Sequence, residues 1–596
     1  MAVGSLSAVS PGASSGSSSA VPPEAAVPAP RRRRLFGAPV RRRMDPVSRL
    51  LLVLVLIALT LLVGLPVLGV MNRAFSSEGL TVLQSFVTSG TNRQLFLNTV
   101  QLGLIVGVLG TCCAFALAYA QARLRFPGQR LIHILTLVPI ISPPFAVAAA
   151  IITLFGRTGM ISYDLLGVRY DIYGLQGLVL ALTLSYLPLA YLNLLGMLRA
   201  LDPAHEEAAS SLGASRWRVF HTVTAPMLVP GFGGAFLLLF VEAISDLSNP
   251  LVLGGNYQVL ASRAYLAIVG EYNLPGGAAY ALVLLIPAVA IFAIQRYWSS
   301  RGVVVSITGK PSGRRQRHTA TSLPGLWIPL AGFAYAMAAL IMLLYGTIVA
   351  GAFVRILGVN NTPTLDNFRY VLTGVGNDAI IDTTLLALIA TPVAGLLGMI
   401  TAWLVVTRVQ RGAALLDFFG MLGIAVPGTV IGIGYVISYS EPTMVFGVPV
   451  LPALVGGSTV FGGAVAIVMA YASGSAPAGQ RTGIAALRQI DPALEEASAS
   501  LGVSTGGTFR RITLPLVRPA FMTGLMYAFA QAMTSVSAII FLVTPHTQIL
   551  TSRIYAEVER GRFGNAFAFC TVLMIIVLAA MLAIHLLTRR MRSVQS

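Results

Sequence analysis

Charged residues are scarce in this sequence, and their scarcity excludes most soluble folds. Only 10% of the 596 residues are charged and 56% are hydrophobic, whereas soluble domains carry about 25% charged residues. Lysine occurs once, at Lys310. A phosphate-binding Walker loop needs a lysine followed by Ser or Thr, but Lys310 is followed by Pro311. We therefore expect a membrane protein that has no ATPase motif of its own.

Cysteine and histidine are also few, which argues against a metal or redox centre. The three cysteines, Cys112, Cys113 and Cys570, lie within apolar runs, and the six histidines are scattered. No cluster has the spacing of metal ligands or of a nucleophile with its base. We predict that the cysteines are small helix-packing residues. We also predict that the chain is not an enzyme and binds no metal or cofactor.

Positive charge is the one kind that is abundant, and its distribution indicates membrane topology. The formal net charge is +19, nearly all from arginines that lie between apolar runs. Cytoplasmic loops of membrane proteins carry such an excess, so we expect a bilayer environment and no nucleic-acid partner. A Ser-, Ala- and Pro-rich start and two arginine clusters precede the first run. This N-terminal segment reads as a disordered, basic cytoplasmic tail.

Apolar runs long enough to cross a bilayer, about 20 residues each, follow one another along the chain. The basic loops between them favour a cytoplasmic location for both termini. The sequence predicts an all-α polytopic membrane protein with twelve transmembrane helices, at residues 50–70, 97–120, 131–155, 174–196, 231–250, 277–296, 326–353, 380–405, 416–438, 451–473, 521–543 and 567–588.

The second half of the chain repeats the first, which indicates a duplicated domain. At an offset of 289, Asp202-Pro203 falls on Asp491-Pro492, and Gly213 falls on Gly502. An offset of 284 aligns Asn98-Thr99 with Asp382-Thr383. Each copy has an even number of spans, so the copies share one orientation and are related by a pseudo-twofold axis along the membrane normal. We predict a tail at 1–48, a first domain at 49–300, a cytoplasmic linker at 301–325 and a second domain at 326–596.

The repeated cytoplasmic stretch has the features of a short, capped helix. Asp202-Pro203 is a helix-start signal, and carboxylates follow in the first turns, where the helix dipole favours negative charge. Small residues come next, and Gly213 ends the helix. An ordinary surface helix between spans is the plain alternative. Two copies at matching places favour a surface that a partner grips.

These stretches, "HEEAASSLG" and "LEEASASLG", resemble the EAA loop of bacterial binding-protein-dependent ABC importer permeases of the type I, fused two-domain kind. The resemblance implies two tandem six-helix permease domains in the inner membrane, two copies of a cytoplasmic ATPase that binds ATP-Mg, and an extracytoplasmic substrate-binding protein. It implies that the two loops are coupling helices that dock on the ATPase. The residues that take this role are Glu206, Glu207, Ala208 and Gly213 in one half and Glu495, Glu496, Ala497 and Gly502 in the other.

One pair of acidic residues lies inside a predicted span. Glu242 and Asp246 are four residues apart and therefore share a helix face, and their counterparts are Gln531 and Ser535. Charges within spans are costly and are functional candidates. The four residues are candidates for lining the pathway, passing a cation or carrying a proton. Alternatively, the acidic pair ties helices by hydrogen bonds or holds Arg263.

The segment "EAISDLSNPLVLGG…LASRAY" resembles the ferric-iron permease class, which implies iron(III) as cargo. Relatives of that class carry aminoalkylphosphonate, thiamine, sulfate or polyamine instead. A secondary transporter with twelve spans is a rival, but it would need no paired coupling loops. Pro143-Pro144 and Pro427 lie in matched spans and are candidates for bending them near a pathway.

Overall fold

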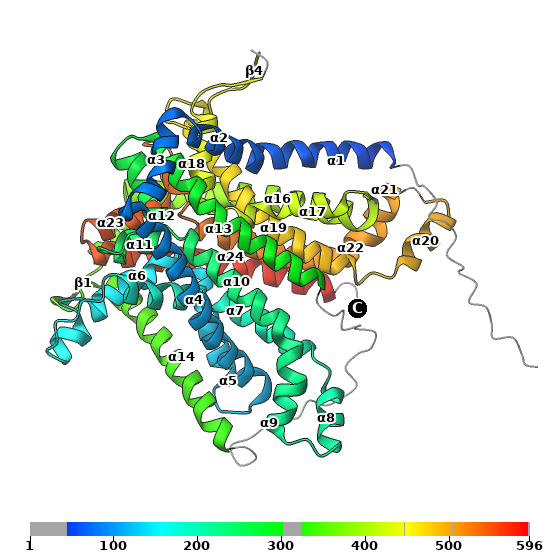
Figure 1. Cartoon of the computed structure of the whole chain (residues 1–596), viewed down its shortest axis with the longest axis horizontal. Coiled ribbons are helices and arrows are strands. Elements are labelled where there is room, and N and C mark those ends of the chain that lie inside the picture. The colour runs from blue at the N-terminus through cyan, green and yellow to red at the C-terminus, as the bar shows by residue number, and fades with distance from the viewer. Residues whose placement is uncertain (1–43, 302–323, 410, 446–447, 504, 594–596) are drawn as a thin grey trace, which may run out of the picture. The chain divides into compact units, whose positions relative to one another are not determined.

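The computed structural model describes residues 44–593 except 302–323, 410, 446–447 and 504. Most of the predicted tail and linker therefore lies outside the described residues. Helices account for nearly all of the described part (Figure 1), so the all-α class is confirmed. Two small antiparallel hairpins accompany them, β1 (Val354–Ile356) with β2 (Asn360–Pro363) and β3 (Thr443–Val445) with β4 (Val448–Leu451).

The first half consists of helices joined by short 3-10 or π turns, labelled η. They are α1 (Pro46–Leu59), η1 (Thr60–Gly64), α2 (Leu65–Ala74), α3 (Ser77–Thr88), α4 (Gly90–Arg123), α5 (Gln129–Leu137), η2 (Val138–Ile141), α6 (Pro144–Phe155), η3 (Met160–Leu165), α7 (Leu175–Ala200), α8 (Pro203–Ser211), α9 (Arg216–Val219), η4 (Phe220–Thr224), α10 (Ala225–Ser245), α11 (Ser248–Leu253), α12 (Leu260–Tyr265), η5 (Leu266–Gly270) and α13 (Leu274–Arg301).

The second half follows the same order of long and short helices. They are α14 (Pro324–Ala352), α15 (Asp366–Leu372), α16 (Val375–Trp403), η6 (Leu404–Arg408), α17 (Ala413–Ala425), α18 (Gly428–Tyr439), η7 (Val460–Gly463), α19 (Ala464–Leu487), α20 (Pro492–Ser500), α21 (Thr505–Thr508), η8 (Phe509–Thr513), α22 (Leu514–Thr534), η9 (Ile539–Phe541), α23 (Leu550–Glu559) and α24 (Phe563–Ser593).

The duplication seen in the sequence recurs in the packing of the two halves. In the first half α4, α7 and α10 pack against one another, and in the second half α16, α19 and α22 do the same. Eleven helices of the described part are long and apolar enough to cross a membrane, or up to twelve if one bent pair is a single span. The twelve predicted spans therefore fit at the upper limit of this count.

The matched prolines interrupt the helices that contain them, as the sequence suggested. The predicted span 416–438 is divided at Pro427 into α17 and α18, which are bent by 97°. The predicted span 131–155 is likewise divided, because η2 ends at Ile141 and α6 begins at Pro144. A residue that precedes proline is pushed out of the helical region, and Pro143 accordingly has an extended backbone with ψ 140°.

Other predicted spans are wrong at their ends. The span expected at 521–543 belongs to a helix that stops at Thr534, and the one expected at 451–473 begins after the β3–β4 hairpin. Apolar composition continues past both helix ends, so hydrophobicity alone misplaced the boundaries.

The first span of each half packs against the opposite half. Helix α2 lies on α18, and α14 lies on α4, α5 and α6 (Figure 1). Tyr439 donates a hydrogen bond to the Leu61 carbonyl (2.6 Å) and Tyr435 donates one to the Leu62 carbonyl (3.1 Å). Both carbonyls belong to the π turn η1. Within a bilayer such groups need a protein partner, so the tyrosines fasten the π turn to the other half.

A close backbone approach supports the same crossing. A Cβ atom added to Gly434 in α18 would lie 2.5 Å from the carbonyl oxygen of Pro66 in α2. Only a residue without a Cβ permits this approach, as in the small-residue interfaces of membrane helices.

We predict that Gly434→Ala destabilises the protein by about 1–3 kcal/mol, because overpacking against a backbone atom forces helices apart. Thermal unfolding of the purified protein in detergent measures the effect. Gly332→Ala in α14 is the control, since its Cβ would meet nothing within 4 Å. Equal melting of the Gly434→Ala variant and the unaltered protein would contradict the observed α2–α18 packing.

Candidate functional site

The two repeated stretches form α8 and α20 with the caps that the sequence predicts. Asp202 accepts a hydrogen bond from the backbone N–H of Ala204 (3.0 Å), and Asp491 accepts one from Ala493 (3.0 Å). Gly213 and Gly502 have φ values of +81° and +75°, which other residues rarely adopt. Local sequence therefore determines where each helix begins and ends.

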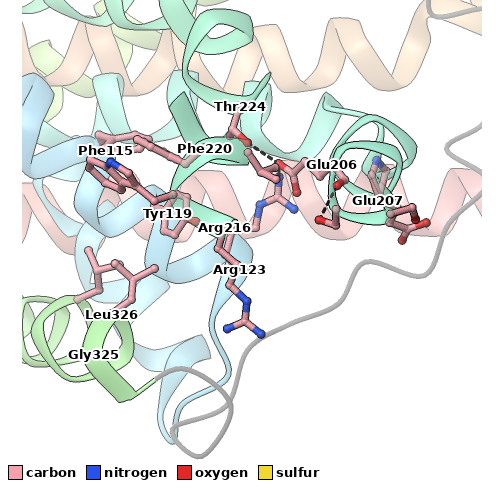
Figure 2. Close-up of a pocket in the computed structure, with 16 residues that line it drawn as sticks. Phe115, Tyr119, Arg123, Glu206, Glu207, Arg216, Phe220, Thr224, Gly325 and Leu326 are labelled. Atoms are coloured by element: carbon pink, nitrogen blue, oxygen red, sulfur yellow. Dashed lines mark hydrogen bonds and ion pairs between the residues drawn. The ribbon is translucent and has the colours of Figure 1, made fainter. Parts of the chain in front are cut away.

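The carboxylate of Glu206 faces the membrane helices. Its Oε1 atom accepts a hydrogen bond from Arg123 Nη2 (2.6 Å), at the end of α4, and another from Thr224 Oγ1 (2.8 Å), which immediately precedes α10. Figure 2 shows the Glu206 side chain extending toward Thr224 and that of Glu207 lying away from it. Two adjacent acidic residues with the same expected role therefore have different surroundings.

Most other residues of α8 are exposed, although Glu207 lines the same cavity as Glu206. Glu207 and Ala208 are exposed, and Glu207 makes no hydrogen bond or ion pair with any described residue. Leu212, directly after α8, and Trp217 in α9 are 88% and 71% exposed. In the second half Ala497 and Gly502 are exposed, and Leu501 is 82% exposed. Large apolar side chains next to a short polar helix are typical of a protein–protein contact.

Glu495 and Glu496 belong to α20, but their side chains lie outside the described residues. Their expected role stays a prediction from the repeat.

A cavity of about 1020 Å³ lies beside α8 and separates part of it from the membrane helices. Aromatic residues of α4 and η4, including Phe115, Tyr119 and Phe220, form one wall, and the start of α14 forms another (Figure 2). Within α8 itself only Pro203 is buried. Apolar packing therefore does little to hold this helix in place.

The four predicted pathway residues line one narrow cavity between the two halves. A cavity of about 160 Å³ is lined by Glu242 and Asp246 from the end of the first-half span and by Gln531 and Ser535 from the second. The adjoining chamber, about 920 Å³, shares Glu242, Gln531 and Ser535 with the first cavity. Glu242 therefore lines both the narrow cavity and the wide chamber, whereas Asp246 lines only the narrow cavity.

Three further lining residues were missed by the sequence analysis. Tyr186 and Tyr527 contribute phenol groups to the narrow cavity, and the exposed Arg481 lines the wide one. Tyr527 precedes Gln531 by four residues and so shares its helix face, which was a usable signal. Tyr186 and Arg481 lie on helices for which the sequence offered no comparable pattern.

The two acids of the pair are held differently. Asp246 is 3% exposed and accepts hydrogen bonds from Tyr186 Oη (2.7 Å), the Asn249 backbone N–H (2.8 Å) and Asn249 Nδ2 (3.2 Å). The Glu242 carboxylate makes no hydrogen bond or ion pair with any described residue, and only the Glu242 backbone carbonyl accepts a bond, from the Asp246 N–H. The alternative role of tying helices together thus applies to Asp246, whereas Glu242 is available to the chamber.

The other alternative, that the pair holds Arg263, is wrong. Arg263 Nη1 instead bonds to Glu271 Oε1 (2.6 Å), and Nη2 bonds to Glu271 Oε2 (3.1 Å). The guanidinium lowers the pKa of the Glu271 carboxyl group below its ordinary value. Among the described residues, no group of three or more His, Cys, Asp or Glu side chains could hold a metal ion.

Two segments, residues 107–304 and 378–593, match the family described as "Binding-protein-dependent transport system inner membrane component". The chain belongs to this family. Each segment contains one copy of the repeated stretch, α8 or α20, and several helices that line the two cavities. The family is one of ABC permeases, so the chain is a multi-pass transport component of the inner membrane.

The expected resemblance to ferric-iron permeases is confirmed by individual relatives. The chain is 32% identical to the ferric transport system permease protein FbpB of Actinobacillus pleuropneumoniae over 84% of its own length and 71% of that protein. A putative ferric transport permease of Haemophilus influenzae is also 32% identical, over 79% of this chain and 72% of the relative. The molybdenum permease ModB of Escherichia coli is 30% identical over 30% of the chain and 79% of ModB.

We predict that Asp246→Ala destabilises this permease by about 1–3 kcal/mol, because it leaves the buried Tyr186 and Asn249 groups without their acceptor. Glu242→Gln removes no such bond and should melt at the same temperature as the unaltered protein. Thermal unfolding in detergent compares the two variants. Equal losses of stability would show that Glu242 also has a structural role.

Proposed function

We propose that this chain is the permease subunit of an ATP-driven importer for iron(III), delivered by an extracytoplasmic binding protein. The observation that carries the proposal is the pair of exposed, capped helices, α8 and α20, at equivalent positions of two family domains. A single chain with two coupling helices calls for two copies of an ATPase, which bind ATP-Mg. Both termini would then lie in the cytoplasm, on the side of α8 and α20.

A secondary transporter is the rival from another class, and it is not favoured by these helices. Alternating access in such a protein needs no external motor, so exposed Leu212, Trp217 and Leu501 would have no partner. An ABC permease gives these side chains a binding surface to cover.

We expect ATP-dependent uptake when the chain is reconstituted in vesicles with its ATPase and binding protein. Glu207→Arg combined with Glu496→Arg should abolish uptake and weaken complex assembly, because Glu207 is exposed on α8 and Glu496 is its counterpart in the repeat. Uptake and co-purification of the ATPase are the two measurements. Uptake without ATP, or normal assembly of the doubly altered chain, would favour the secondary transporter.

The chemistry of the chamber supports a cationic cargo. In the narrow cavity Glu242 and Asp246 contribute negative charge, and Tyr186, Tyr527, Gln531 and Ser535 contribute further oxygen atoms. The positive charge of Arg481 belongs to the wide cavity beside it. Hard metal ions are bound by oxygen ligands, whereas an oxyanion would meet like charge at short range. An iron(III) ion therefore suits this lining better than the oxyanions sulfate and molybdate do.

We predict that gallium(III), a redox-inert analogue of iron(III), competes with iron for uptake and that sulfate and molybdate do not. Glu242→Gln should lower iron uptake by about tenfold, because one carboxylate in a poorly hydrated chamber is worth about 1–3 kcal/mol to a passing cation. Gln531→Asn is the matched control on the opposite wall. Strong competition by an oxyanion would contradict iron(III) as the cargo and would indicate an anionic cargo.

A further inference from the structure

Two adjacent glutamates on the coupling helix α8 are expected to share one docking role, but only Glu206 bonds to the neighbouring helices. Residues next to each other on a helix point about 100° apart. Glu207 is exposed, whereas the carboxylate of Glu206 lies between membrane helices (Figure 2). Docking of a partner accounts for Glu207 and leaves the contacts of Glu206 unexplained.

We propose that Glu206 is a positioning residue that joins the coupling helix to two membrane helices. One of its oxygen atoms receives Arg123 at 2.6 Å and Thr224 at 2.8 Å. The side chains of Arg123 and Glu206 are only 10% and 25% exposed. Charge-assisted hydrogen bonds of this length are among the stronger polar contacts in proteins, and partial burial limits their screening by salt. We name the Arg123–Glu206–Thr224 contact the α8 tie.

The surroundings of α8 make the α8 tie important. Pro203 is the one buried residue of the helix, and the cavity of about 1020 Å³ lies between α8 and its neighbours. With little apolar contact, a force applied to the outer face of α8 would tilt the helix into the cavity. The α8 tie opposes that tilt, because it spans the gap to the ends of both neighbouring helices.

The two helices joined by the α8 tie reach the acidic pair of the chamber and the loop around α12. Thr224 directly precedes α10, whose far end carries Glu242 and Ser245 in the chamber. Arg123 ends α4, whose other end bonds the loop around α12: Asn98 Nδ2 donates to the Gln258 carbonyl (3.0 Å), and Thr99 Oγ1 accepts from the Leu260 N–H (2.9 Å). Energetic coupling between distant sites is carried by such rigid elements and polar contacts.

The proposal concerns the first half and rests on the proposed function, since it assumes that an ATPase moves α8. It assigns different tasks to the two glutamates. Glu207 belongs to the docking surface, and Glu206 transmits the displacement. Loss of Glu207 should therefore weaken binding of the ATPase. Loss of Glu206 should leave binding intact but raise the ATP hydrolysed per ion transported.

The experiment compares Glu206→Gln, Arg123→Gln and Thr224→Val in the full complex with ATPase and binding protein. We expect Glu206→Gln to raise the ATP hydrolysed per ion transported by about tenfold, within the usual range of coupling between sites, with normal co-purification of the ATPase. Thr222→Val is the matched control, since Thr222 bonds only within its own helical turn, to the Arg218 carbonyl. It should keep the ratio of the unaltered complex.

Two further measurements separate transmission from a general loss of structure. The effects of Arg123→Gln and Glu206→Gln should not multiply when they are combined, because both remove one contact, and the reversed pair Arg123→Glu with Glu206→Arg should recover part of the coupling. Amide hydrogen exchange at residues 203–211 of the permease, without any partner, should rise in Glu206→Gln and stay unchanged in Glu207→Gln.

The outcomes distinguish this proposal from the proposed function. Absence of ATP-driven uptake by the unaltered complex would refute the importer and leave the exchange measurement to decide the α8 tie. Uptake with an unchanged ATP ratio in Glu206→Gln, or unchanged exchange in α8, would overturn the α8 tie alone. Loss of ATPase binding in Glu206→Gln, with normal exchange, would make Glu206 a docking residue and also overturn it.

Discussion

Backbone groups inside a bilayer must find their hydrogen-bond partners within the protein, and this constraint underlies the arrangement of the two halves. The π turn η1 interrupts the first span, and Tyr435 and Tyr439 of the second half bond to its carbonyl groups. Tyr335 and Trp327 of α14 bond in turn to carbonyls of the loop after α4. Each first span is thereby fastened to the opposite half, and the chamber forms between halves that are held on both sides.

The chamber and the coupling helices are connected by the same element. The segment Arg216–Ser245 runs from the coupling loop to the acidic pair as one membrane-crossing length of helix. The ends of this segment carry the two chemical features that mark the chain, a contact with the coupling helix and a carboxylate at the chamber. No loop interrupts the segment between these two ends.

The two halves contribute equivalent helices to the chamber, but the side chains on these helices differ between the halves. Equivalent helices of the two halves meet at the chamber, yet the carboxylates come from one half and neutral polar groups from the other. Domain duplication supplies two walls of the same shape. The two walls therefore differ in charge although equivalent helices build them.

Much of the architecture could be read from local sequence. The caps at Asp202 and Asp491, the positive φ of Gly213 and Gly502, the proline breaks and the repeat follow from short-range sterics and hydrogen bonding. The repeat also placed Glu242 and Gln531 at equivalent helix positions, but the expected shared helix face is wrong for Asp246 and Ser535, which follow the last residues of α10 and α22 in extended backbone. Helix ends near residues 451 and 543 were misjudged, because apolar composition does not distinguish a span from the loops buried beside it.

The sequence by itself determined the all-α class, the order of the apolar segments, the two repeated capped helices and the acidic pair. Only the tertiary structure decided that Asp246 is bonded while Glu242 faces the chamber, that Tyr186 and Tyr527 join them, and that Glu206 turns inward to Arg123. Local rules act over a few residues, whereas these contacts join residues that are tens to hundreds of positions apart. Their geometry depends on how whole helices pack, which no short stretch of sequence encodes.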